Sequence, residues 1–244
     1  MKKGFTMTNI FLPHSISQLK QAFTLAEVLI TLGIIGVVAA MTMPTLIANH
    51  KKKVYATKVK YTYNIVSNAL LSSVAENGSP NTWDYGSKIN AGGSSSLQNG
   101  AHTKEMAKKY FIPYFKVIKE GSDDNGYYIV ISNGITLTFN TDGGTNSEGI
   151  YTPSALYITA SFNNNTKQYY SSTRDYSQKD VFMTINVLET NARVKFFNWG
   201  GETRNGIINE ARYGCRKEIA KSRRYGCAAL IQHDGWEIKD DYPW

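Results

Sequence analysis

Histidine and cysteine, the side chains that build most zinc sites, are scarce in this chain of 244 residues. There are four histidines and two cysteines, and the histidines are scattered, at positions 14, 50, 102 and 233. This spacing lacks the close ligand pairs of a metal cluster. The sequence also has no phosphate-binding loop, no dinucleotide glycine fingerprint and no nucleophile elbow. The chain is therefore not expected to be an enzyme, and neither a metal nor a cofactor is predicted.

Charge is absent from a long stretch near the N-terminus. No Asp, Glu, Lys or Arg occurs from Val28 to Ala48, and at about 1.5 Å per residue such a helix is roughly 31 Å long, which matches the hydrocarbon core of a bilayer. The core of an ordinary secretory signal is shorter, at about 7 to 15 residues. The sequence therefore predicts a helix that crosses a membrane.

One acid, Glu27, lies at the start of this apolar segment. A carboxylate there costs several kcal/mol unless it is paired, so it marks a functional position. The residues from Ala22 to Leu29, AFTLAEVL, resemble the cleavage and methylation signal of type IV pilins and type II secretion pseudopilins. The resemblance implies that a prepilin peptidase cuts between Ala22 and Phe23 and methylates the new amine of Phe23. The family usually has Gly where this chain has Ala22. A secretory signal and a plain membrane anchor are the weaker alternatives.

The resemblance also implies three parts: a leader, 1–22; a spine helix, 23–76, that is transmembrane over 23–48; and an extracytoplasmic β-rich domain, 77–244. The function it implies is that of a structural subunit of a type IV pilus or type II secretion filament in the bacterial inner membrane. The expected partners are the peptidase, copies of the chain, other pilin-like subunits, the inner-membrane assembly machinery and the lipid bilayer. Lysines are more numerous after the span than before it. Taken alone, this count would place the C-terminal domain in the cytoplasm, but we place it outside, as the resemblance implies.

The second half of the spine shows a helical apolar pattern. Apolar side chains recur every three or four residues, at positions 55, 59, 63, 66, 70 and 74, and line one face of a helix. Asn77 and Gly78 form a helix stop. Beyond a loop, 77–101, the sequence predicts a short helix, 103–111, a hairpin turning at Asn133 and Gly134, and strands at 156–162, 181–187 and 193–197. The expected fold is α+β and pilin-like, with an antiparallel sheet packed on the long helix.

The two cysteines lie in two copies of the sequence RYGC, as Cys215 and Cys227. A lone close pair in an exported domain is most simply one disulfide. The loop between them contains five cations and Glu218, and we interpret it mainly as a solvated surface. The alternative is a minor pilin that acts in DNA uptake or adhesion. Its candidate nucleic-acid contacts are Arg216, Lys217, Arg223 and Arg224, although the loop contains no Trp or Phe for stacking on bases.

Glu27 is expected to set the register of subunits in a filament. Cleavage creates a positive amine on Phe23, and the amine of the same chain lies about 6 Å along the helix axis, so the amine of a neighbouring subunit is the better partner. The alternative is that only the peptidase recognises Glu27.

A calcium loop around Asp142, in the segment 140–148, is a weak alternative to a polar turn, because it lacks the alternating acids of an EF-hand.

Overall fold

A computed structural model describes residues 24–85, 100–123, 126–145, 151–167 and 171–244. The chain divides into two compact units, with the boundary between Ala48 and Asn49. The described part of the first unit is helical from Leu25 onward, and the second unit contains the sheet and the entire hydrophobic core.

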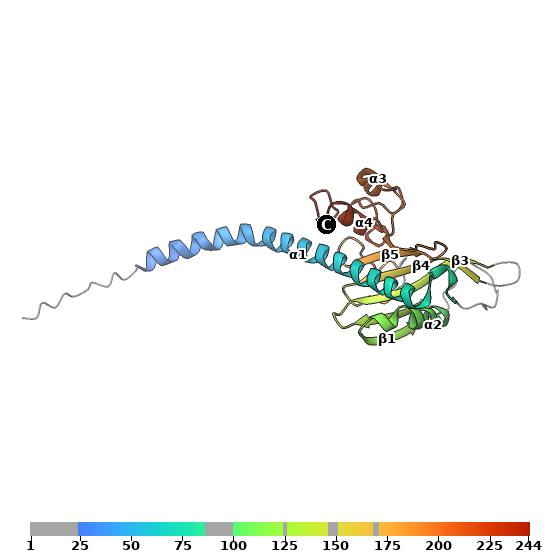
Figure 1. The fold of residues 1–244 in the computed structure, drawn as a ribbon. Helices are drawn as coiled ribbons and strands as arrows, with labels where there is room; N and C mark the ends of the chain where they lie inside the picture. Colours follow the sequence, from blue (N-terminus) through green and yellow to red (C-terminus); the bar gives the residue numbers. More distant parts are fainter. Residues whose placement is uncertain (1–23, 86–99, 124–125, 146–150, 168–170) are drawn as a thin grey trace, which may run out of the picture. The chain divides into compact units, whose positions relative to one another are not determined.

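Figure 1 shows the helices and strands in chain order. Their bounds are α1 (Leu25–Asn77), η1 (Pro80–Thr82), α2 (Gly100–Tyr110), η2 (Ile112–Tyr114), β1 (Val117–Asp123), β2 (Gly126–Ile131), β3 (Thr136–Thr145), β4 (Tyr151–Ser161), β5 (Asp180–Asn186), β6 (Val194–Phe196), α3 (Arg204–Asn209), η3 (Lys221–Arg223) and α4 (Cys227–His233).

The predicted long helix is α1, which continues through Pro44. Its apolar face in the second unit is the expected one, because Tyr55, Val59 and Leu70 are buried. The helix ends at the predicted stop, where Gly78 adopts a positive φ of 78° and its amide donates to the carbonyl oxygen of Val74 at 3.0 Å. Glycine is the residue that takes this backbone conformation without a steric cost.

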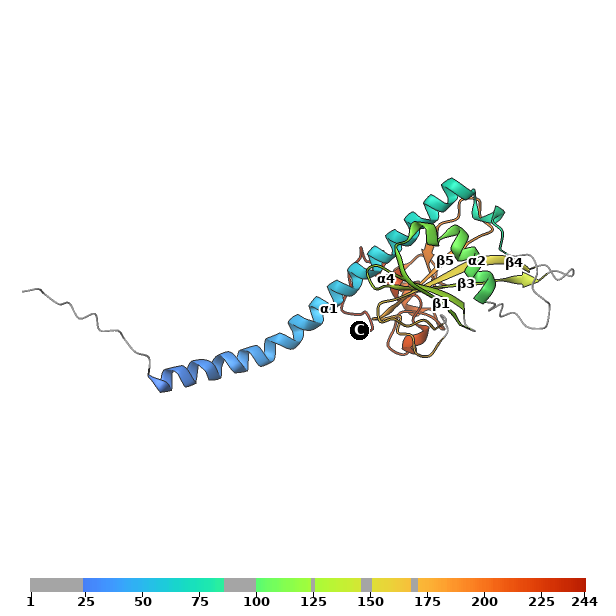
Figure 2. The same ribbon diagram turned by 90° about the horizontal axis from the view of Figure 1, so that it is seen from below.

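In the part of the chain that the structure describes, β1 to β6 form one antiparallel sheet in sequential order. Figure 2 shows β1, β3, β4 and β5 of this sheet. The predicted hairpin joins β2 to β3, and Gly134 at its turn has a φ of 81°. The three later strands were also predicted, but β4 begins at Tyr151, five residues before the predicted start. The sequence missed β1, an edge strand whose Ile118 and Lys119 are exposed, so that it lacks the apolar alternation of a half-buried strand.

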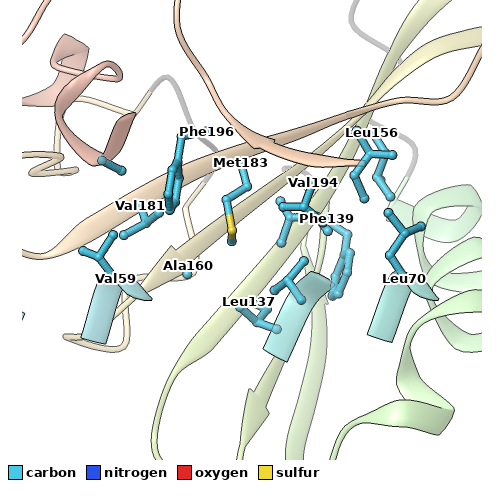
Figure 3. Close-up of a cluster of buried hydrophobic side chains, with 14 of the residues drawn as sticks. Val59, Leu70, Leu137, Phe139, Leu156, Ala160, Val181, Met183, Val194 and Phe196 are labelled. Atoms are coloured by element: carbon cyan, nitrogen blue, oxygen red, sulfur yellow. The ribbon is translucent and has the colours of Figure 1, made fainter. Parts of the chain in front are cut away.

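The α1 helix packs on one face of the sheet, which confirms the α+β fold. In Figure 3, Leu137, Phe139 and Met183, which come from β3 and β5, lie in the part of the core between Val59 and Leu70 of α1. All five side chains are at most 2% exposed. Apolar burial on this scale contributes about 1.5 to 3 kcal/mol per large side chain, so this interface stabilises the second unit.

The opposite face of the sheet carries a smaller aromatic cluster. Phe182 lies between core residues of β5 in sequence but belongs to a separate group with Tyr176, Phe197 and Tyr225. Its ring centroid is 4.9 Å from that of Phe197 and 5.0 Å from that of Tyr225. Because alternate residues of a strand face opposite sides, β5 contributes side chains to both clusters.

The predicted loop 77–101 contains more structure than expected. Pro80–Thr82 forms η1, and α2 begins at Gly100 rather than at Thr103. The anchor is Trp83, which is buried and stacks on Tyr110 with ring centroids 4.3 Å apart. Residues 86–99 of this segment lie outside the described part of the chain.

The C-terminal segment is held by one arginine at the start of α3. Arg204 donates through Nε and Nη2 to the two carboxylate oxygens of Asp234, at 2.8 and 2.9 Å, and through Nη1 and Nη2 to those of Asp241, at 2.8 Å each. Lys239 adds a bond of 3.0 Å to Asp234. Burial alone would raise the pKa of Asp234, but the hydrogen bonds and charges of Arg204 and Lys239 outweigh it and lower this pKa to about 2.

This lowered pKa predicts acid sensitivity. The carboxyl of Asp234 has a pKa near 4 in an unfolded chain and about 2 in the folded one, so its stabilising contribution is complete above pH 4 and is lost as the pH falls through 2. Its size is about 2 kcal/mol. Urea unfolding of residues 49–244 between pH 2 and 6 should show this loss, and D234N should remove it. D240N, at an exposed site, is the control; an equal effect of D240N would contradict the assignment.

Candidate processing and assembly site

The helix α1 starts with a reciprocal capping arrangement between Thr24 and Glu27. The amide and hydroxyl of Thr24 donate to Oε2 of Glu27 at 2.8 and 2.9 Å. In return, the amide of Glu27 donates to the Thr24 hydroxyl oxygen at 3.3 Å. This is a capping box, which satisfies amide groups that have no partner within the helix. The sequence T-x-x-E is itself a signal for a capping box, which is a role of Glu27 in addition to the predicted register and peptidase roles.

The capping box leaves part of the carboxylate available. Oε1 of Glu27 accepts no hydrogen bond within the described residues, and the side chain is exposed. A second donor can therefore approach Glu27 while Thr24 retains its contacts. Ala22 and Phe23, the predicted cleavage and methylation residues, lie outside the described part of the chain, so this part of the site stays a prediction.

The helix that follows this box has an uncovered apolar surface. Exposed side chains include Leu29 at 61%, Ile35 at 63% and Leu46 at 71%. This helix is long and apolar enough to cross a membrane, and its most apolar window has no buried residue. An apolar surface of this length is stable only in contact with lipid or with other apolar helices.

The predicted disulfide is present near the C-terminus. Cys215 and Cys227 are bonded, and their Cα atoms are 4.7 Å apart. Both cysteines are buried. The two RYGC copies also contact each other directly, because the amide of Gly226 donates to the carbonyl oxygen of Tyr213 at 3.0 Å. The repeat in the sequence is thus a pair of segments that pack together.

One predicted cation of the disulfide loop lies inside the domain. Arg224 is 6% exposed, and its guanidinium donates to the carbonyl oxygens of Ile219 at 2.8 Å, Lys217 at 2.9 Å and Pro243 at 3.1 Å. It also donates to the hydroxyl of Ser177 at 3.2 Å. The prediction that Arg224 is a surface contact for nucleic acid is wrong, because these acceptors hold its charge in the interior.

The other three candidate contacts remain accessible to different degrees. Lys217 and Arg223 are exposed, and Arg216 is partly buried, with Nη1 3.4 Å from the carbonyl oxygen of Asn209. The surface available for phosphate groups is therefore smaller than the sequence indicated.

An exposed aromatic side chain lies beside this loop, outside the segment searched in the sequence. Trp199 is 62% exposed, and its ring centroid is 5.1 Å from that of Tyr213. Tyr213 in turn stacks on Tyr225 at 4.8 Å, and the guanidinium of Arg212 lies 5.9 Å from the Tyr213 ring centroid. Trp199, which follows β6 in the chain, therefore places an aromatic ring beside a disulfide loop that itself contains no Trp or Phe.

A buried ion pair connects α1 and the sheet. Nη1 of Arg174 donates to Oδ1 of Asp180 at 2.8 Å, and neither side chain has exposed surface. The amide of Asp175 donates to Oδ2 of Asp180 at 2.7 Å, and the hydroxyl of Tyr55 donates to the carbonyl oxygen of Asp180 at 3.0 Å. Burial is the main cause that raises the pKa of the Tyr55 hydroxyl. The hydroxyl therefore stays protonated and can donate this hydrogen bond.

The stretch that loosely matched a calcium loop is a strand. Asp142 lies within β3, and its carboxylate accepts a hydrogen bond from the hydroxyl of Tyr157 at 2.9 Å. Residues 146–150 of this stretch are outside the described residues. Among the residues that the structure does describe, no group of three or more His, Cys, Asp or Glu could hold a metal ion.

Comparison with known proteins gives two family matches. A model described as the prokaryotic N-terminal methylation motif, which is the type IV pilin and pseudopilin signal, matches residues 18–43. A model described as a family of unknown function (DUF6613) matches residues 45–244. No curated protein and no solved structure matches the chain. The chain belongs to this DUF6613 family and carries, ahead of the matched region, the N-terminal signal of the type IV pilin and pseudopilin superfamily.

Proposed function

We propose that this chain is a structural subunit of a bacterial type IV pilus or type II secretion filament. It is made as a precursor with a leader, 1–22, is cut between Ala22 and Phe23, and is methylated on Phe23. The observation that carries the proposal is the position of the methylation motif on an α1 segment whose apolar side chains are uncovered.

In this proposal α1 has two successive environments. Residues 23–48 cross the inner membrane as a single span, and residues 77–244 lie outside the cytoplasm, where the disulfide is stable. On assembly, neighbouring subunits replace lipid around the apolar surface. The partners are the prepilin peptidase, other copies of the chain, other pilin-like subunits and the inner-membrane assembly machinery. No catalytic activity is part of this function.

Processing and assembly are tested together on the native protein. Intact mass and N-terminal sequencing of the membrane-extracted protein should give a methylated chain that begins at Phe23. Electron microscopy of sheared surface material, with antibody labelling, should show the chain in filaments. A chain that begins at any residue other than Phe23 would contradict the processing step. A processed chain that is absent from filaments would contradict only the structural role.

A minor pilin that binds DNA is the second candidate, and the exposed Trp199 beside the disulfide loop is the observation that favours it. An aromatic ring can stack on a base while nearby cations neutralise phosphates. The chain with W199A combined with R216Q, K217Q and R223Q should then retain single-stranded DNA at least about tenfold more weakly, in a salt-dependent shift assay. The control, K116Q with K119Q and K195Q, removes a similar charge elsewhere. Equal retention by both variants would reject this candidate.

A further inference from the structure

A cavity of about 440 Å³ lies within the second unit, beside the first turns of α1 after Asn49. Its wall combines cations with aromatic rings. The cations are Lys51, Lys58 and Lys179, and the rings include Phe162 and Trp244.

Within the described residues, the three lysines have no acidic partner. None of them forms an ion pair in the part of the chain that the structure describes, whereas the nearby Lys52 lies 3.9 Å from Asp240. Lys58 lies over the ring of Phe162, with Nζ 5.6 Å from its centroid. Converging positive charges repel each other, so the cavity is complementary to an anion.

The position of the cavity in the chain indicates which anion it meets. Lys51 is three residues after Ala48, the last residue of the uncharged apolar segment. If that segment crosses the bilayer, the residues that follow emerge at the level of the lipid headgroups. Tryptophans and tyrosines are typical of this level on both sides of a membrane, and the positive charge of lysine attracts the negative charge of anionic headgroups.

We propose that this cavity binds the headgroup of an anionic phospholipid from the membrane that α1 crosses. Lys51, Lys58 and Lys179 contact the phosphate, and the rings of Phe162 and Trp244 contact the glycerol and the first carbons of the acyl chains. The proposal rests on the proposed membrane anchoring of α1. A bound lipid would hold the folded unit against the membrane before the subunit is extracted into a filament.

Native mass spectrometry of the full chain in detergent tests this inference. With phosphatidylglycerol in the detergent, one bound lipid should be retained at least tenfold more than with phosphatidylcholine. The variant K51Q/K58Q/K179Q should lose this preference. The variant K116Q/K119Q/K195Q, which loses the same charge at exposed lysines of the sheet region, should keep it.

Each other outcome overturns the inference. Equal retention of the two lipids, or equal loss in both variants, would show that there is no specific headgroup site. Displacement of phosphatidylglycerol by an equimolar amount of inorganic phosphate would assign the cavity to a free anion. The mass of the same protein ion shows whether the chain begins at Phe23, so failure of the proposed processing is seen separately from failure of lipid binding.

Discussion

Replacing Asp180 with asparagine is expected to lower the free energy of unfolding of residues 49–244 by about 3 to 5 kcal/mol. The carboxylate is fully buried against Arg174, with a nitrogen–oxygen distance of 2.8 Å. Asparagine has nearly the same shape but no charge, so the guanidinium charge of Arg174 would stay buried beside a neutral amide. Removing one member of a buried pair costs much more than the pair contributes, because the other member keeps its desolvation cost.

Urea unfolding followed by circular dichroism measures this loss, and two variants separate its causes. The double variant R174M/D180L removes both charges, and its free energy of unfolding should fall by less than that of D180N. K221M breaks the pair between Lys221 and Asp175, which is 3.7 Å long with a lysine that is 58% exposed, and should cost less than about 1 kcal/mol. A loss below 1 kcal/mol for D180N would show that the Arg174 charge is compensated by other groups.

Regular patterns in the sequence predicted α1 and most of the sheet. The apolar spacing from Tyr55 to Val74 identified the buried helical face, and the Asn133-Gly134 pair identified the hairpin, because each depends on residues close in sequence. The edge strand β1 was missed because two consecutive residues, Ile118 and Lys119, are both exposed, so the apolar alternation of a half-buried strand is absent. The local sequence pattern was sufficient to predict a helix or strand wherever that element buries one of its faces.

The polar interior could not be predicted in the same way. Arg174, Asp180 and Arg224 lie in segments rich in charged and polar residues, which on composition alone indicate solvent-exposed loops. Their burial depends on acceptors supplied by distant parts of the chain, such as the carbonyl oxygen of Pro243 for Arg224. Trp199 was missed for a related reason, since its contact with Tyr213 is made across fourteen residues of sequence.

The capping box changes the hypothesis for Glu27, because this carboxylate now has two candidate roles in the mature subunit, apart from recognition by the peptidase. In the first, Oε2 and Thr24 only stabilise the start of α1, a local effect of about 1 kcal/mol. In the second, the negative charge of Glu27 pairs with the methylated amine of Phe23 in a neighbouring subunit. Repetition of such a contact from subunit to subunit does not close and generates a helical filament.

The two roles make opposite predictions for two conservative variants. E27Q retains an oxygen that can accept from Thr24, since glutamine also occupies this position of capping boxes, but it has no charge. T24A retains the charge but loses the hydroxyl contacts with Glu27. If the charge sets the register, E27Q is excluded from filaments and T24A enters them. If the cap is decisive, T24A is impaired and E27Q is not.

We expect the charge to be decisive, and E27L to be excluded from filaments as strongly as E27Q. A subunit at a wrong axial offset buries an unpaired charge at a cost of about 3 to 5 kcal/mol, which disfavours that offset by at least about a hundredfold. Without the charge this discrimination disappears and the amine of the neighbouring Phe23 is buried unpaired. Tagged variants expressed beside the wild-type chain, quantified in sheared filaments after normal cleavage at Phe23 has been verified, provide the measurement. Because the apolar surface of α1 from Val28 to Ile47 is unchanged in E27L, normal incorporation of this variant would show that apolar contacts alone fix the register, and the ion-pair hypothesis would have to be abandoned.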